Sequence, residues 1–398
     1  MKTALIICEY NPFHRGHKFQ VEHLKKELGY SHVIALMSGN MVQRGDMAIF
    51  DKYFRAKIAC ENGCDVAFEL PYIYSGQTAE IFSRGAVMLM DKLGVVDSLC
   101  FGCENDEQDK FYQVANALLN ESDEFKAILK ESLSKGTSFI NARNKALCQT
   151  LDIDEEFLST PNNILGIEYV KSLLETNSSV KVVPLKRKSA KHNDVGECDG
   201  FCSASHLRKL LRENRLDEIS KVIDEGIIKE YISQEMNSID NYAMIIASNL
   251  LLKGKENLSS KLQLEIGLEN RIFDRLNLLN EGVEPFTQAV STKRITKSRI
   301  RRSLLNYLLE VNEESLNSFK ETPPNYITLL SFNSSGKELL SKIKSESTLK
   351  IVSNPNKSRN DLSLRDAELF DLENKADALY HLFNKKYTAD GKHRPTII

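Results

Sequence analysis

The chain has 398 residues, of which 41% are hydrophobic and 27% are charged, and its formal net charge is −2. This length suits two domains, and the share of hydrophobic residues supports a sizeable buried core and excludes a wholly disordered chain. The near-neutral charge excludes a uniformly basic nucleic-acid-binding surface, although it leaves room for a local basic face. No apolar run is long enough for a membrane-spanning helix.

The first apolar run and the cysteines favour a cytoplasmic protein. The run starts at Ala4 and is interrupted by Glu9, which is too short for a signal-peptide core and predicts a buried strand. The eight cysteines are spread along the chain, so we expect no disulfide framework and a reducing compartment. Cys100 and Cys103 form a Cys-x-x-Cys pair, but Cys100 lies in an apolar run, as a strand residue does. We therefore expect buried thiols, and we predict no metal site.

The first half of the chain alternates short apolar runs with helical patterns. The runs predict strands at residues 4–8, 32–37, 65–70, 98–101 and 180–185. The helical patterns cover residues 17–28, 52–61, 78–93 and 163–175, with a further stretch from about 109 to 151. Such an alternation predicts an α/β fold, a parallel sheet covered by helices on both faces. Ligands of such sheets bind beyond the carboxyl ends of the strands, so the loops after the first, fourth and fifth strands are candidate sites.

The second half carries mostly helical periodicity. It covers residues 205–213, 241–252, 262–281, 300–309 and 364–383, while residues 326–331, after a Pro-Pro break, have a strand pattern. We predict two domains: an α/β domain over residues 1–205 and a mostly helical domain over residues 206–398.

The segment after the first strand carries the most specific chemical signal. The chain has no Gly-x-Gly and no Gly-Lys-Ser/Thr fingerprint; the strand is followed instead by EYNPFHRGH at residues 9–17. His14 and His17 are three residues apart and share one face of a helical turn, while Gly16 leaves space for a ligand. At a helix N-terminus, imidazoles donate hydrogen bonds to phosphate oxygens and stabilise charge at phosphorus. The alternative is a pair of surface or capping histidines in an ordinary strand-to-helix loop.

This strand, His-x-Gly-His and helix arrangement resembles the nucleotidyltransferase superfamily, which includes adenylyltransferases and class I aminoacyl-tRNA synthetases. Further motifs resemble the bacterial tRNA(Met) cytidine acetate ligase family, and together they are much more specific than His-x-Gly-His alone. They cover most of the chain and are densest over residues 1–210. The motifs are EYNPFHRGH at 9–17, MSGN at 37–40, QRG at 43–45, DK at 51–52, ELP at 69–71, FG at 101–102 and STPNNILGIEY at 159–169.

The resemblance implies a Rossmann-like nucleotidyltransferase domain and an ATP-dependent ligase. The family makes acetyl-adenylate from ATP and acetate. It then transfers the acetyl group to N4 of the wobble cytidine of elongator tRNA(Met), which gives N4-acetylcytidine without acetyl-coenzyme A. The resemblance also implies that residues 1–205 bind ATP, with Mg²⁺ on the ATP phosphates, and that residues 206–398 bind tRNA.

The resemblance also implies the site residues. His14, His17 and Arg208 are the candidate catalytic residues. The candidate ATP-binding residues are Ile7, Cys8, Glu9, Tyr10, Asn11, Pro12, Phe13, His14, Arg15, Gly16, His17, Lys18, Phe19, Gln20, Gly102, Asn162 and Arg187.

Several of these residues have simpler interpretations. Gly102 is also read as a plain turn glycine, Asn162 as a helix N-cap, and Arg187 as part of a solvated basic loop. Ser203 to Arg208 resemble the second phosphate motif of the superfamily, but serines at a helix start are more often simple caps. Ser205 stands where the family is expected to have threonine, and residues 191–194 match no His-Asp pair cleanly and receive no role.

A basic stretch in the second half is the predicted tRNA contact. Residues 293–302 hold six Lys/Arg, which suits the RNA backbone, although a charge run is usually a solvated helical face. The predicted contacts are Lys293, Arg294, Lys297, Arg299, Arg301 and Arg302. Two other functions stay open: a small-molecule adenylyltransferase, and a non-catalytic RNA-binding protein with a vestigial nucleotide pocket.

Overall fold

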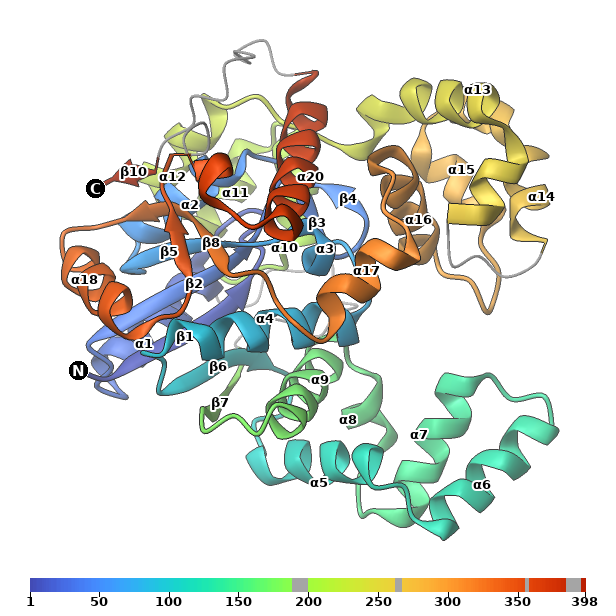
Figure 1. The fold of residues 1–398 in the computed structure, drawn as a ribbon, viewed down its shortest axis with the longest axis horizontal. Helices are drawn as coiled ribbons and strands as arrows, with labels where there is room; N and C mark the ends of the chain where they lie inside the picture. The colour runs from blue at the N-terminus through green and yellow to red at the C-terminus, as the bar shows by residue number, and fades with distance from the viewer. Residues whose placement is uncertain (188–199, 262–266, 355–357, 384–394) are drawn as a thin grey trace.

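The computed structural model describes residues 1–187, 200–261, 267–354, 358–383 and 395–398 (Figure 1). In these residues, the main sheet consists of β1 (Thr3–Cys8), β2 (His32–Ser38), β5 (Val66–Leu70), β6 (Ser98–Cys103), β7 (Lys181–Lys186), β8 (Tyr326–Phe332), β9 (Lys350–Val352) and β10 (Thr396–Ile397). The strand order is β10-β8-β5-β2-β1-β6-β7, with β9 also paired to β8. Only the β5–β8 pair is antiparallel among these described strands. A separate hairpin joins β3 (Met41–Val42) to β4 (Asp46–Met47).

Helices occupy most of the remaining chain. Those of the first half are α1 (Arg15–Lys26), α2 (Lys52–Glu61), α3 (Tyr72–Ser75), α4 (Ala79–Leu93), α5 (Gln108–Leu119), α6 (Asp123–Ser134), α7 (Phe139–Thr150), α8 (Glu155–Ser159) and α9 (Pro161–Glu175). Those of the second half are α10 (Ala204–Arg212), α11 (Leu216–Val222), α12 (Glu225–Ile232), α13 (Ala243–Lys261), α14 (Leu268–Phe273), α15 (Val283–Val290), α16 (Lys297–Leu309), α17 (Glu313–Lys320), α18 (Gly336–Glu346) and α20 (Leu364–His381). Short 3₁₀ turns lie at η1 (Ile239–Tyr242), η2 (Leu276–Asn280) and η3 (Arg359–Asp361).

Both faces of the sheet are buried, which explains why its strands are almost continuously apolar. In β1, Leu5 and Ile7 pack into the core shared with α4, α5 and α9, whereas Ala4 and Ile6 pack into the core shared with α1, α2 and α10–α12. This alternation is the period of two expected of a strand between two helical layers. The predicted α/β class with a mostly parallel sheet is confirmed.

The strand order places the candidate site. The chain runs outward from β1 through β2 to β5 and then returns to the other side of β1 with β6 and β7. The direction of the order therefore reverses at β1, and the crevice beyond the carboxyl ends of β1 and β6 is where such sheets bind ligands. The loop 9–14, Gly102 and Arg187 all lie at these ends.

All five strands predicted in the first half are present, and residues 326–331 form the core of β8. The long helical stretch predicted from about 109 to 151 is broken into α5, α6 and α7. Asn120 ends α5, and Gly136 follows α6 with a φ of 80°. Of the stretch predicted at 262–281, residues 262–266 lie outside the described residues, and the remainder forms α14 and η2.

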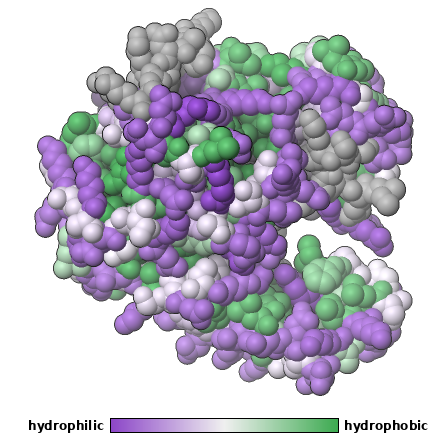
Figure 2. Space-filling model, viewed as in Figure 1, coloured by the Kyte–Doolittle hydropathy of each residue, from purple (hydrophilic) through white to green (hydrophobic). Residues whose placement is uncertain are grey.

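The predicted division at residue 205 does not coincide with the end of the α/β unit. Beyond it, α10–α12 complete the core on the second face, and β8 adds to the sheet beside β5. Because Leu329 and Leu330 belong to opposite cores, the short apolar run of β8 requires helices on both of its faces. Figure 1 shows α13–α16 as a group at one side of the sheet, and Figure 2 shows a hollow between it and the projecting α6 and α7. In the described part of the chain, no helix is long and apolar enough to cross a membrane.

Candidate active site

The two motif histidines close the N-terminus of α1. His14 is the N-cap: its Nδ1 accepts the backbone N–H of Gly16 at 3.1 Å, and His17 Nδ1 accepts the backbone N–H of His14 at 3.3 Å. The two rings are stacked, with centroids 3.7 Å apart and planes at 19°. A Cβ on Gly16 would lie 2.9 Å from the His14 ring, so glycine is needed between the histidines. His14 therefore caps the helix, as the alternative interpretation predicts. The capping hydrogen bond also fixes the orientation of the His14 ring.

These hydrogen bonds set the protonation of both rings. Because each Nδ1 accepts a backbone N–H, the neutral ring carries its proton on Nε2. Burial, followed by the charge of Arg187, lowers the pKa of His14 from 6.5 to about 3. Burial also lowers the pKa of His17 well below 6.5, and His14 and Arg187 lower it further. At neutral pH the site therefore presents two neutral Nε2–H donors.

The rest of the loop is held rigidly from several elements. Tyr10 and Phe13 are 1% exposed and pack edge-on against each other at 5.0 Å. The Asn11 side chain accepts the backbone N–H of Ile49 at 2.8 Å, and the Tyr231 hydroxyl donates to the Phe13 carbonyl at 2.8 Å. A loop tied in this way keeps the histidines in place without a ligand.

Arg208 joins this loop from α10. Its Nη1 donates to the Asn11 carbonyl at 2.7 Å, and the helix start is fixed by Ser203, whose hydroxyl accepts the backbone N–H of His206 at 3.2 Å. Burial lowers the pKa of Arg208, and the neighbouring carboxylate of Glu9 opposes this shift. The start of α10, capped by Ser203, thus places the Arg208 guanidinium against the loop after β1.

Arg187 and Asn162 meet at the carboxyl end of β6 and β7. Arg187 Nη1 donates to Asn162 Oδ1 at 3.2 Å, and Asn162 Nδ2 donates to Glu104 Oε1 at 2.6 Å. Gly102 lies under Arg187, because a Cβ there would be 3.4 Å from Arg187 Cγ. Asn162 is the first residue after Pro161 in α9 and holds the arginine rather than capping the helix with its side chain. The structure thus brings Gly102, Asn162 and Arg187 together.

The remaining predicted loop residues have other contacts. Arg15 and Lys18 both form ion pairs with Asp224, at 3.2 and 2.5 Å, so α1 is fastened to α12. Gln20 donates to the Cys100 thiol at 3.4 Å, and Phe19 packs against Phe201. These side chains support the loop from behind rather than line the crevice. Cys100 and Cys103 are fully buried, as expected.

Comparisons with known proteins identify the family to which this site belongs. A family model described as HIGH Nucleotidyl Transferase matches residues 1–394. A tRNA(Met) cytidine acetate ligase of Clostridium botulinum (strain Kyoto / Type A2) is 37% identical, and the alignment covers 100% of this chain and 99% of that protein. The same-named protein of Thermosipho melanesiensis is 38% identical over 89% of this chain and 85% of its own length.

Solved structures agree with the sequence relatives. The crystal structure of apo Thermotoga maritima TmcAL has a TM-score of 0.91, 32% identity and full coverage of both chains. The same protein bound with alpha-thio ATP gives a TM-score of 0.90 at 32% identity. The chain belongs to the tRNA(Met) cytidine acetate ligase family. The resemblance inferred from its motifs is therefore confirmed, and with it the assignment as an enzyme.

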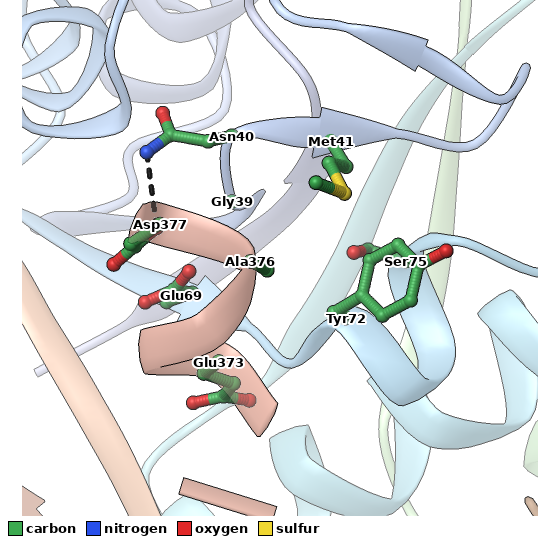
Figure 3. A pocket seen from close by; sticks show the side chains of 9 residues that line it. All are labelled: Gly39, Asn40, Met41, Glu69, Tyr72, Ser75, Glu373, Ala376 and Asp377. Atoms are coloured by element: carbon green, nitrogen blue, oxygen red, sulfur yellow. Dashed lines mark hydrogen bonds between the residues drawn. The ribbon is translucent and has the colours of Figure 1, made fainter. Parts of the chain in front are cut away.

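Side chains from several motifs of the tRNA(Met) cytidine acetate ligase family meet in a cluster with Asp377 of α20. Lys52 Nζ lies 2.7 Å from Glu69 Oε2 and 2.5 Å from Asp377 Oδ2. Figure 3 shows the Asn40 side chain donating to Asp377, at 3.0 Å. Burial raises the pKa of Glu69 to about 7, while the charge of Lys52 opposes this shift. The adjoining cavity measures about 10 Å³, enough for one water molecule and too small for a nucleotide. This cluster fastens α20 to the ends of β2 and β5.

Sequence reasoning missed Arg55, which holds the loop from below. Its side chain is 1% exposed and donates to four backbone carbonyls, those of Glu9, Ser38, Gly39 and Phe50. It thereby joins the carboxyl ends of β1 and β2. The available signal was an arginine three and four positions before the buried residues Ile58 and Ala59, the helical spacing of one face.

The predicted tRNA-binding residues fall into two groups. Lys293 and Arg294 are exposed before the N-cap of α16 at Thr296. Lys297 and Arg301 are paired with Glu284, and Arg302 donates to the Gln43 carbonyl at 3.3 Å. Arg299 is half-buried. The basic stretch is therefore continuous in sequence, but Lys293 and Arg294 are its most accessible charges.

Proposed function

We propose that this chain activates acetate with ATP as acetyl-adenylate. It then transfers the acetyl group to N4 of the wobble cytidine of elongator tRNA(Met), in the cytoplasm. The observation that carries the proposal is the stacked pair of neutral histidines at the start of α1, with Arg187 and Arg208 beside them. Neutral donors with neighbouring guanidinium groups suit a reaction at phosphorus, in which negative charge develops and no protein nucleophile is needed.

In the first step, an acetate oxygen attacks the α-phosphorus of ATP. A new P–O bond forms, the bond from the α-phosphorus to the bridging oxygen breaks, and pyrophosphate leaves with the electron pair. The Nε2–H groups of His14 and His17 donate to phosphate oxygens, while Arg187 and Arg208 supply positive charge. Mg²⁺ would accompany the ATP substrate as the counter-ion of its phosphates.

In the second step, the N4 amine of cytidine attacks the acetyl carbon. A C–N bond forms, the C–O bond to AMP breaks, and the amine loses a proton. The base must leave its stack in the RNA loop to reach the crevice. The rigid loop at Tyr10 and Phe13 suits this step, because it holds the adenylate in place while the RNA binds.

We assign RNA binding to the helical side of the molecule around α16. Lys293 and Arg294 are the proposed backbone contacts, and Lys297, Arg299, Arg301 and Arg302 extend the positive charge toward the sheet. Because Arg302 contacts the carbonyl of Gln43, and the Gln43 backbone N–H donates to Glu9 Oε1 at 2.9 Å, this basic helix is joined to the His-x-Gly-His loop. Bound RNA would thus lie next to the crevice.

An acetyl-transfer assay tests the proposal. Purified protein is incubated with radiolabelled acetate and tRNA, with and without ATP, and label in the RNA is counted. We expect ATP-dependent label in elongator tRNA(Met), located on N4-acetylcytidine after nuclease digestion. The double variant K293Q/R294Q should lose label in tRNA but retain acetate-dependent pyrophosphate exchange. Transfer of AMP to a small metabolite with no label in RNA would instead support an adenylyltransferase.

A further inference from the structure

The β3–β4 hairpin presents an arginine that neither the sequence motifs nor the fold had assigned to a role. Its turn, residues 43–45, connects two parts of the site. The Gln43 backbone N–H donates to Glu9 Oε1 at 2.9 Å, and its carbonyl accepts from Arg302. Gly45 has a φ of 73°, and a Cβ on it would lie 2.5 Å from the Arg302 nitrogen. Arg44 is therefore held between the His-x-Gly-His loop and α16.

The Arg44 side chain is exposed, and within the described part of the chain it makes no hydrogen bond or ion pair. Two acidic side chains of this region accept hydrogen bonds from backbone N–H groups. Glu9 accepts from Gln43, and Asp46 accepts the backbone N–H groups of Met47 at 2.8 Å and Ile239 at 3.0 Å. An arginine that is positioned at a site but has no partner there is a candidate for binding an anion.

Arg44 is close enough to Arg187 and Arg208 for its charge to affect their pKa values. Burial lowers the pKa of Arg187 and of Arg208, and among further charges that of Arg44 lowers both. Arg208 is bonded to Asn11, in the same loop whose Glu9 holds Gln43. In the absence of a ligand the charge of Arg44 repels each of the other two guanidinium groups, and a polyanion bound among them would offset this repulsion.

We infer that Arg44 is a third phosphate-binding arginine, which with Arg187 and Arg208 holds the triphosphate of ATP. The inference rests on the proposed use of ATP. It deepens that proposal by assigning a residue from the hairpin to the phosphates. A guanidinium binds phosphate oxygens through two parallel N–H donors, so replacing Arg44 removes a charge-assisted contact.

Calorimetric titration of ATP and of adenosine, on wild-type protein and the R44Q variant, tests the inference. We expect R44Q to weaken ATP binding by about tenfold, because one charge-assisted contact is lost. Adenosine binding should change by less than about twofold, since adenosine has no phosphate. The matched control is K229Q, which removes the charge of an exposed side chain on α12. This control should bind both ligands as the wild type does.

Two results would overturn the inference. The first is unchanged ATP affinity in R44Q; if tRNA acetylation is lost at the same time, Arg44 binds a phosphate of the RNA instead. The second is equal loss of ATP and adenosine affinity, which would indicate a purely structural role. Because the titrations need no acetyl transfer, a wild type that binds ATP but does not acetylate tRNA would contradict the proposed function and not this residue.

Discussion

At the scale of single residues, the backbone hydrogen bond to His14 decides its chemistry. The Gly16 N–H occupies Nδ1, so the ring that caps α1 must direct its Nε2 proton away from the helix. Protonation at Nδ1 would break that bond and charge a buried group. Burial is the largest cause that lowers the pKa of His14 to about 3, and the positive charge of Arg187 lowers it further.

The His14 ring should therefore stay neutral as the ligand-free protein is acidified. We expect its NMR resonances to show no titration between about pH 8 and pH 5, whereas the same ring in urea-unfolded protein titrates near its ordinary pKa. Because the unfolded chain binds the proton more tightly, the free energy of unfolding should fall as pH drops from about 6.5 toward about 3. A folded-state midpoint near pH 6.5 would contradict the assigned tautomer.

At the scale of elements, the contact between the β3–β4 hairpin and α16 links the His-x-Gly-His loop to the basic helix. It depends on Gly45, which combines a positive φ with close approach to the backbone of Arg302. An alanine at position 45 would be destabilised both by the positive φ and by the steric overlap of its Cβ with the Arg302 backbone.

The G45A variant should thus lose more stability than G29A. Gly29 has a similar φ of 67°, but a Cβ added to it would meet nothing within 4 Å, so G29A reports the backbone penalty alone. We expect G45A to be destabilised by about 1–3 kcal/mol beyond G29A in urea denaturation. Equal destabilisation of the two variants would mean that the hairpin does not pack tightly on α16.

How far the sequence predicts this structure depends on the range of the interactions. The strands of the parallel sheet can be recognised in the sequence because their apolar runs have five to seven residues. The His-x-Gly-His segment can be recognised because its functional residues are close together in the sequence. The two-residue strands β3 and β4 carry no such pattern. Asp377 is 325 positions from Lys52, so only the fold brings the two together at 2.5 Å.

At the scale of the whole molecule, the second half of the chain completes the first. β8 covers β5 with antiparallel hydrogen bonds, and α10–α12 cover the second face of the sheet. Residues 1–205 alone would leave the edge of β5 and that apolar face in water. The sheet and the helices after residue 205 share a core, so we expect them to unfold as one cooperative unit.

A fragment of residues 1–205 should therefore fail to fold as a stable monomer. We expect it to unfold without a cooperative transition in thermal circular dichroism, or to aggregate, while the full chain unfolds cooperatively. The full chain lacking only residues 395–398 is the control, because it loses the short edge strand β10 and little else. Cooperative unfolding of the 1–205 fragment would contradict the shared core.

The central claim is that the loop at His14 forms an acyl-adenylate without RNA, and acetate-dependent exchange of radiolabelled pyrophosphate into ATP measures it directly. The variant H14N keeps a side-chain acceptor at the N-cap and removes the Nε2–H donor, so it separates capping from chemistry. We predict that the wild type exchanges pyrophosphate only when acetate is present, and that H14N is slower by about 100-fold or more while remaining folded. Exchange that is independent of acetate, or equal in the folded H14N variant, would contradict the account.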